Sequence, residues 1–337
     1  MPAAGIAVAD CHNDLLLGCL HRYERGVTDP FGEDWLPGLR AGGVVLQVLP
    51  IFTEEQFIGE GALRRALELI AMARRIAEQH AADVGIAETA ADLQRILGEG
   101  RIALLIALEG VEPVGSSLSM FETLWRLGVR MASLTWNRRT MMADGAGEAD
   151  TGGGLTSLGV EAVAEMERLG MIVDVSHLSD AGTAHVAAVA RRPFVASHSS
   201  CRALCGHPRN LSDEQLRLLA AAGGFVGLNA FGRFLTATGT PTLPHYLDHV
   251  AHAAAVAGDG AVAIGADFIC DLVRQVDPIL GRQLLVKPSD LVHIADFRRP
   301  ADFARLTPLL SERFGAERAA RFAAGNVVDF LHAHLPG

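Results

Sequence analysis

The tetrapeptide Cys11-His12-Asn13-Asp14 follows the first apolar run of the chain, residues 5–10. Alternate residues of a strand point to the same side, so His12 and Asp14 are predicted to present an imidazole and a carboxylate together. Such a pair can hold a divalent metal ion. A lone His-x-Asp pattern is weak, because a histidine at a strand end can instead bond to the backbone while the aspartate is solvated.

Metal-ligand residue types recur at the ends of four later apolar runs. These runs cover residues 102–109, 171–177, 194–198 and 261–267, and they end in Glu109, His177, His198 and Asp267. A hydrolytic two-metal centre needs a carboxylate between the ions, neutral imidazoles around them and an open position for water. The five strand-end coincidences therefore favour a two-metal centre over a purely structural chain.

The candidate ligands divide into two sets around one bridge. We predict that His12 and Asp14 hold one ion, His177 and His198 hold the other, and Glu109 joins them. Many barrel hydrolases use a carbamylated lysine as the bridge, but Lys287 is the only lysine and lies well past the last apolar run. Asp267 is then the candidate proton carrier, beside two alternatives: a further metal ligand or a helix N-cap.

The charge and the hydrophobic content of the chain indicate which kinds of binding partner to expect. The chain has 337 residues, a net charge of −10 and a half-hydrophobic composition. The acidic balance argues against nucleic acid, which needs clustered lysine and arginine. No membrane span and no leader of a basic region followed by an apolar core is visible, so we expect a soluble cytoplasmic protein. The five cysteines show no CxxC pair and are expected to be free thiols.

The order of the expected elements predicts the fold class. Eight β-rich runs alternate with amphipathic helical patterns, and the runs cover residues 5–11, 44–52, 102–109, 131–136, 171–177, 194–198, 224–230 and 261–267. This alternation is typical of a parallel sheet, and eight repeats favour a (β/α)8 TIM-type barrel. An open doubly wound sheet is the alternative. An open sheet would spread the candidate ligands along the edge formed by its strand ends, whereas a barrel brings them together at one end.

Two long connections and two terminal helices complete the predicted organisation. Residues 138–156 are rich in glycine, aspartate and methionine and are predicted to form an active-site loop, and residues 270–298 form a second excursion. Residues 301–314 and 316–335 are predicted to be closing helices. No linker is visible, so we expect residues 1–337 to form a single barrel domain.

Several motifs taken in order resemble the membrane dipeptidase (renal dipeptidase) family of binuclear zinc peptidases, within the amidohydrolase superfamily. They are Asp10-Cys-His-Asn-Asp14, Ala107-Leu-Glu-Gly110, Asp174-Val-Ser-His177, Ser197-His-Ser-Ser200, His207-Pro-Arg-Asn210 and Gly265-Ala-Asp-Phe268. The resemblance implies two zinc ions per chain at the ligands named above and Asp267 as the acid and base. It also implies that Arg209 holds the free carboxylate of a dipeptide, and Asn210 of the same motif is predicted to lie in the substrate site. Family members are often dimers, so a homodimer is expected.

The chain departs from the renal enzyme's pattern at two positions. Where that pattern has Leu-Thr-His-Asn, this chain has Leu134-Thr135-Trp136-Asn137. An indole can donate one hydrogen bond but cannot accept or carry a proton. We predict that Trp136 contacts the substrate, either as a wall of the pocket or as a donor, with the wall favoured. The second departure is Phe268-Ile269-Cys270, which leaves the shape of the last loop and the choice of substrate open.

These observations predict a zinc dipeptidase that cleaves dipeptides with a free C-terminal carboxylate. The resemblance also suggests tolerance of a D-residue at the C-terminal position. One alternative is an amidohydrolase of another small amide, such as an N-acyl amino acid or an intermediate of secondary metabolism. Another is a catalytically silent zinc-binding relative. Of the other histidines, His207 is expected to cap a turn, and His245, His249 and His252 are expected to lie on a partly exposed helix face.

Overall fold

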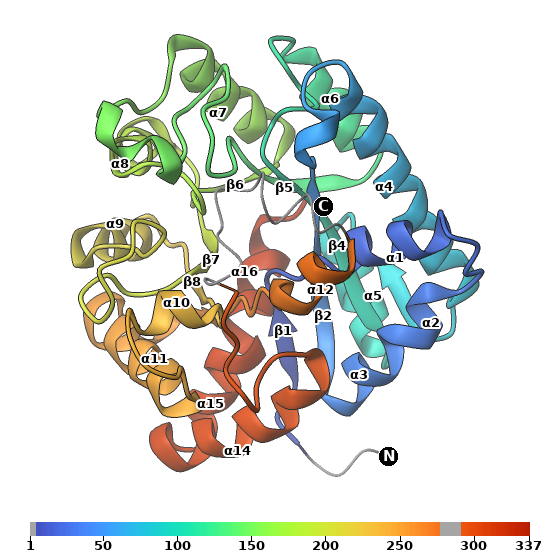
Figure 1. Cartoon of the computed structure of the whole chain (residues 1–337), viewed down its shortest axis with the longest axis vertical. Coiled ribbons are helices and arrows are strands. Elements are labelled where there is room, and N and C mark those ends of the chain that lie inside the picture. The colour runs from blue at the N-terminus through green and yellow to red at the C-terminus, as the bar shows by residue number, and fades with distance from the viewer. Residues whose placement is uncertain (1–4, 277–290) are drawn as a thin grey trace.

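The computed structural model describes residues 5–276 and 291–337, and its centre is a parallel sheet (Figure 1). Eight strands follow the order β6-β5-β4-β2-β1-β9-β8-β7, and the ninth, β3, pairs with β4. The strands are β1 Val8–Asp10, β2 Val44–Phe52, β3 Val84–Ile86, β4 Ile102–Glu109, β5 Val129–Ser133, β6 Ile172–Asp174, β7 Ala196–Ser199, β8 Val226–Leu228 and β9 Val262–Ile264.

The sheet closes on itself between β6 and β7. A parallel bridge joins Asp174 to Val195. The Val175 amide donates to the Val195 carbonyl at 2.7 Å, and the Val195 amide donates to the Val173 carbonyl at 2.9 Å. This closure confirms the predicted barrel and rules out the open doubly wound sheet. The extra strand β3 was not predicted, because three residues with a central glycine give too short an apolar pattern.

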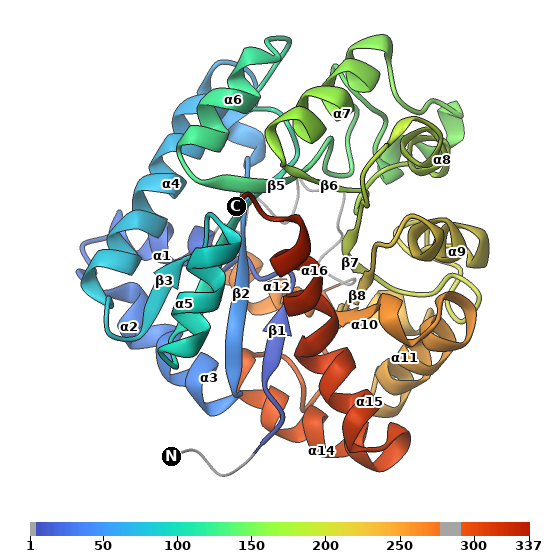
Figure 2. The same cartoon turned by 180° about the vertical axis from the view of Figure 1, so that it is seen from behind.

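Helices surround the strands in both views (Figures 1 and 2). The first group is α1 Leu15–Tyr23, α2 Pro30–Asp34, α3 Leu36–Ala41, α4 Gly61–Gln79, α5 Ala90–Gly98, α6 Ser119–Arg126, α7 Ser157–Leu169 and α8 Asp180–Val189. The second group is α9 Asp213–Ala221, α10 Gly232–Leu235, α11 Leu243–Ala257, α12 Ile269–Val276, α14 Phe303–Phe314, α15 Ala316–Ala320 and α16 Asn326–His334. Between α15 and α16 lies a π-helical turn, Arg321–Gly325.

Local capping explains why several helices begin where they do. The side chain of Thr156 accepts from the Gly159 amide at the start of α7, and that of Ser179 accepts from the Gly182 amide at the start of α8. At α9, Ser212 and Gln215 form a reciprocal capping box. Each of these contacts satisfies an amide that the first helical turn leaves without a partner.

The inside of the barrel is filled by alternate residues of the strands. Leu46 and Val48 of β2 and Ala103 and Leu105 of β4 belong to one buried apolar cluster. The cluster also includes Val327, Phe330 and Leu331 of α16. Helix α16 therefore closes one end of the barrel, whereas α12 lies across the opposite face, as the two views together show (Figures 1 and 2).

The two predicted long connections differ from the expectation in detail. Residues 138–156 form a loop that contains only a short 3₁₀ segment, Ala146–Thr151, but none of them lines the site cavity described below. The loop instead supports the site, because the Ala146 amide donates to the His177 carbonyl at 2.7 Å. The second connection opens with α12, and Lys287 lies outside the described residues.

Among the described residues, no helix combines the length and the apolar character that crossing a bilayer requires.

Candidate metal centre and substrate cavity

The candidate ligands gather at the carboxyl ends of the strands. Glu109 is the last residue of β4, and His198 lies within β7. His12 and Asp14 come after β1, which ends at Asp10, and Asp14 is the N-cap of α1. A turn, and not the alternation of a strand, therefore brings these two side chains together. Their Nε2 and Oδ2 atoms lie 3.7 Å apart.

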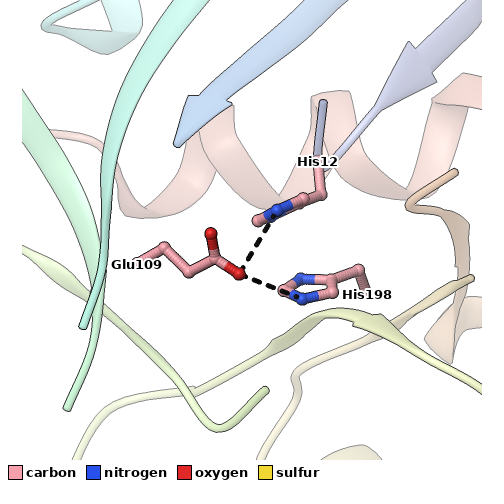
Figure 3. Close-up of side chains that lie close together, drawn as sticks. All are labelled: His12, Glu109 and His198. Carbon is pink, nitrogen blue, oxygen red and sulfur yellow. Dashed lines mark ion pairs between the residues drawn. The ribbon is translucent and has the colours of Figure 1, made fainter. Parts of the chain in front are cut away.

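Three imidazoles converge on one carboxylate oxygen. Oε1 of Glu109 lies 2.9 Å from Nε2 of His177 and 3.6 Å from Nε2 of both His12 and His198. Figure 3 shows His12 and His198 pointing at the Glu109 carboxylate from two sides. All four side chains are buried. The arrangement offers nitrogen and oxygen donors of the kind that divalent zinc prefers.

The outer ring nitrogens of two histidines have fixed partners. Nδ1 of His177 lies 2.8 Å from Oδ1 of Asn137, and Nδ1 of His198 lies 2.8 Å from Oγ of Ser197. The Ser197 hydroxyl donates to the Asp174 carboxylate, so its oxygen is an acceptor for His198. Both imidazoles then carry their proton on Nδ1 and direct the Nε2 lone pair inward.

The inward lone pairs of His177 and His198 lie so close together that a bound cation would stabilise them. The Nε2 atoms of His177 and His198 lie 2.7 Å apart, a distance at which two lone pairs repel. The buried Nε2 of His12 has no hydrogen-bond partner among the described residues. These three ring nitrogens fit a metal centre, where the lone pair of each would coordinate an ion.

Burial and charge shift the pKa values of the cluster in opposite directions. Burial raises the pKa of Glu109 well above its ordinary value and lowers the pKa values of His177 and His198 well below theirs. Burial also lowers the pKa of His12, but the Glu109 and Asp14 carboxylates outweigh it and raise that pKa to about 10. The carboxylates thus favour positive charge at this point, while the two other imidazoles stay neutral, as ligands must be.

A second group of donors shares His12. Ligand atoms of His12, Asp14 and Asp267 all lie within 4.8 Å of one another. The Asp267 carboxylate accepts a hydrogen bond of 2.9 Å from Nδ2 of Asn229, which fixes its orientation. Asp267 thus lies close enough to a potential ion site to act either as a ligand or as a proton carrier.

Backbone strain is concentrated in this cluster. Among the described residues, the non-glycine positions with positive φ are His177 at 72° and Asp267 at 53°. L-residues enter this region at a cost of order 1 kcal/mol or more, and such residues persist where surrounding contacts hold them. The Asp267 amide donates to the His12 carbonyl at 3.0 Å, so the strained backbone at Asp267 is tied to that of another candidate ligand.

A cavity of about 590 Å³ opens beside the cluster. Its polar lining includes Asp14, Glu109, His177, Asp267 and Arg209. Its apolar lining comes from two clusters that meet at Ile269: one contains Leu17, Phe52 and Trp136, and the other contains Phe231, Phe234, Val273 and Leu291. The volume suits a small molecule with both polar and apolar parts.

Arg209 is a buried cation in the wall of this cavity. One of its NH2 groups donates to the His198 carbonyl at 3.1 Å, and the other lies 3.5 Å from Oγ of Ser199. Its Nε has no partner among the described residues, and burial lowers its pKa to about 10, so the group remains charged at neutral pH. A buried guanidinium with a free donor is well suited to bind a carboxylate.

Trp136 packs between aromatic and cationic neighbours. Its ring lies 5.3 Å from that of Phe52 and 5.6 Å from that of His177, and the Arg138 guanidinium lies 5.2 Å from its centre. The indole is nearly buried and lines the cavity. These contacts hold the ring at the edge of the cavity, and its role toward substrate stays a prediction.

Other predicted residues take supporting positions. Nδ2 of Asn210 donates to the carbonyls of Cys205 and Phe234 at 2.8 and 2.7 Å, and Asn210 does not line the cavity. We therefore assign it to holding the loop and not to touching substrate. His207 accepts from the Arg209 amide through Nδ1 at 3.1 Å, the turn-capping role expected for it. His249 differs from the expected partly exposed position, because it is buried against the backbone of Cys201 and Leu235.

Four polar residues around the candidate ligands were not assigned a role from the sequence: Asn137, Asp174, Ser197 and Asn229. Asn137, Asp174 and Asn229 follow or end strands, so the same strand-end signal that marked Glu109 marks them as well. Ser197 gave no such signal, because it lies within β7 and not at its end, and because the carboxylate that it contacts, Asp174, comes from another strand.

Comparisons with known proteins agree with this geometry. The model of the membrane dipeptidase family (peptidase family M19) matches residues 3–282. The dipeptidase verJ of Clonostachys rogersoniana is 38% identical over 208 residues, which cover 61% of this chain and 53% of the relative. The dipeptidase aclJ of Aspergillus oryzae is 31% identical over 282 residues, which cover 78% and 67%. The matched part of this chain thus spans about half to two thirds of the length of these relatives.

A solved structure shares the fold. The metallopeptidase from Rhodobacter sphaeroides, bound to a phosphinate mimic of the dipeptide L-Ala-D-Ala, superposes with a TM-score of 0.84 at 23% identity, over 98% of this chain and 99% of the other. Since the family model covers most of the chain and the barrel is shared, the chain belongs to the membrane dipeptidase family.

Proposed function

We propose that this protein is a zinc-dependent dipeptidase that hydrolyses dipeptides with a free C-terminal carboxylate. The observation that carries the proposal is the presence, in one cavity, of converging metal donors and the buried Arg209 guanidinium, whose Nε has no hydrogen-bond partner among the described residues. The first can support hydrolysis of an amide, and the second can hold the end of a short peptide beside it.

Two zinc ions per chain form part of the proposal. His12 and Asp14 would hold one ion, His177 and His198 the other, and Glu109 would bridge them. When bound, the ions would polarise the scissile carbonyl and lower the pKa of water at the site. Asn137 and Ser197 keep the two imidazoles in the tautomer that coordination requires.

Asp267 is the proposed proton carrier. Its carboxylate lines the cavity and is held by Asn229, so it can take a proton from water at one side and give it to the departing amine at the other. The strained backbone at this residue supports a functional assignment, since strain of this kind clusters at active sites.

One structural relative supports a proposal about the stereochemistry of the substrate. The Rhodobacter sphaeroides metallopeptidase binds a mimic of a dipeptide with a D-residue at its C-terminal end. We therefore propose that this chain also accepts a D-residue there. The proposal further includes a cytoplasmic location and a homodimer, which cell fractionation and light scattering test.

A turnover assay on a small panel tests the function. The zinc-loaded protein is given dipeptides with an L- or D-residue at the C-terminal end, the C-terminal amides of the same dipeptides, and N-acetyl amino acids. We expect release of free amino acids from the dipeptides, and a loss of roughly tenfold or more in kcat/KM for the amides, because they cannot form the charge-assisted pair with Arg209.

The control variant is Arg209→Met, which should treat acids and amides nearly alike. Hydrolysis of N-acetyl amino acids without hydrolysis of dipeptides would identify an amidohydrolase of another class. Zinc binding with no turnover of any compound would identify a silent relative.

A further inference from the structure

A second cationic side chain lines the cavity and has no part in the proposed cleavage. Arg233 lies on α10, one residue before Phe234, and is half-buried. Its NH1 lies 3.5 Å from the carbonyl of Ala237, which also lines the cavity, so the guanidinium lies at the solvent-exposed rim of the cavity.

The charge of Arg233 is not neutralised by a carboxylate among the described residues. Two arginines of the outer helix α14 and its neighbour α15, in contrast, do have such partners: Arg313 pairs with Asp248 at 2.7 Å and Arg318 with Asp259 at 2.7 Å. The carboxylates that line the cavity are those of Asp14, Glu109 and Asp267, and they belong to the candidate metal cluster. Arg233 is therefore left as a positive charge that faces the cavity.

The position of Arg209 decides which part of a substrate would meet Arg233. The Arg209 guanidinium lies 5.6 Å from the Phe234 ring, on the side of the cavity formed by Phe231 and Phe234. A carboxylate held by Arg209 would thus place the C-terminal residue of a dipeptide on this side, beside α10. The other side, with Trp136 and Phe52, would receive the N-terminal residue.

We infer that Arg233 is a specificity-determining residue that pairs with a carboxylate on the side chain of the C-terminal residue, so that dipeptides ending in aspartate or glutamate are preferred substrates. This inference rests on the proposed dipeptidase function. A guanidinium binds a carboxylate in a two-pronged geometry that a neutral amide cannot match.

Isosteric pairs of substrates provide the test. The zinc-loaded protein is assayed with Ala-Asp against Ala-Asn and with Ala-Glu against Ala-Gln, each with the L- and the D-form of the second residue, and with Ala-Ala as reference. We expect kcat/KM to favour the acid of each pair by about tenfold. In Arg233→Met this ratio should fall to about one, while kcat/KM for Ala-Ala should change little.

Two further variants separate the charge from the shape of the side chain. Arg233→Lys should keep part of the preference, because the positive charge remains. Arg64→Met removes an exposed arginine from α4, away from the cavity, and should keep the full preference. Thermal melting of each variant shows whether it is folded.

The outcomes distinguish this inference from the proposed function. Hydrolysis of dipeptides without preference for the acid, or with a preference that survives in Arg233→Met, overturns the inference and leaves the dipeptidase function intact. If no dipeptide is hydrolysed, the proposed function fails. In that case calorimetric binding of Ala-Asp and Ala-Asn still decides on Arg233: tighter binding of Ala-Asp that is lost in Arg233→Met supports the inference, and equal binding overturns it.

Discussion

The Ser197 hydroxyl connects the Asp174 carboxylate to the Nδ1 atom of His198. In Ser197→Ala the imidazole loses the acceptor that fixes its tautomer. We expect zinc affinity to fall about 10- to 100-fold, the usual effect of losing a partner behind a ligand. Competition with a chromophoric chelator measures this. The matched control is Ser200→Ala, because that hydroxyl donates to the Asn229 carbonyl and to no imidazole. Equal zinc affinity in Ser197→Ala and the parent would contradict the assignment.

The role of Asp267 separates into two measurable properties. Asp267→Asn keeps the size of the side chain and an oxygen for Asn229, but it cannot carry a proton. We expect kcat to fall at least about 100-fold, as for other general acid–base groups, with zinc content and substrate affinity retained. Metal analysis beside steady-state kinetics checks both properties. Loss of zinc in this variant would make Asp267 a ligand instead.

Trp136 offers a contrast between two substitutions. If the indole is a wall, Trp136→Phe should be nearly neutral and Trp136→Ala should mainly raise KM, because the smaller side chain leaves substrate less well held. If the indole nitrogen donates to the reacting carbonyl, Trp136→Phe should lower kcat/KM by roughly 100- to 1000-fold. Kinetics of the two variants on one dipeptide decide. The ring packing against Phe52 favours the wall.

Most of the candidate site residues can be predicted from the sequence, because metal-ligand residue types stand at the ends of apolar runs. The residues predicted in this way lie in one cavity or at its edge: His12, Asp14, Glu109, His177, His198 and Asp267. The partners that orient them were not found in this way, because contacts such as Asn229 with Asp267 join residues 38 apart in the chain. Sequence spacing reports neighbours on one element, and these pairs form only when the barrel closes.

At the scale of elements, α12 connects the candidate proton carrier to the wall of the cavity. Leu272 of this helix packs in the cluster that contains Leu17, Phe52 and Trp136. In Leu272→Ala we expect a loss of about 2–3 kcal/mol in the free energy of unfolding and a rise in KM, because the cavity wall loses its support. Denaturant titration and kinetics measure the two effects.

The control is Leu67→Ala, since Leu67 on α4 is 41% exposed and should contribute little to stability. A Leu272→Ala protein with parental KM would show that α12 is held by its other contacts.

Long elements were predicted more accurately than short ones. The runs at residues 44–52 and 102–109 match β2 and β4 from end to end. Each has enough periodic apolar residues to show its period. The first helix, α1, was missed because it begins within the metal-binding motif itself, where Asp14 is both N-cap and candidate ligand. Because Asp14 was interpreted as a metal ligand, its second role as the residue that begins a helix was overlooked.

At the scale of the whole molecule, the candidate metal centre brings together residues that lie in or directly after β1, β4, β6 and β7. Metal binding to the folded chain alone should stabilise it, with about 2.7 kcal/mol gained when free zinc is at 100 times its Kd. We expect chelation to lower Tm by roughly 5 °C or more, and zinc to restore it. If residues 1–337 form a single domain, both melts show one transition.

Glu109→Gln is the matched variant for this experiment. A neutral amide bridges two cations poorly, so its Tm should respond little to chelation, and its zinc content and activity should be low. Full activity with one tightly bound ion in this variant would exclude the two-metal arrangement.

Because α16 seals the far end of the barrel, the cavity has its opening at the end where α12 lies. Under the proposed function, substrate would therefore enter, and both amino acids would leave, by the same route. A released amino acid would present the same free carboxylate to Arg209 as an incoming dipeptide would. We expect the reaction to slow as its own products accumulate, in a competitive manner, so that steady cleavage depends on how quickly the surroundings consume free amino acids.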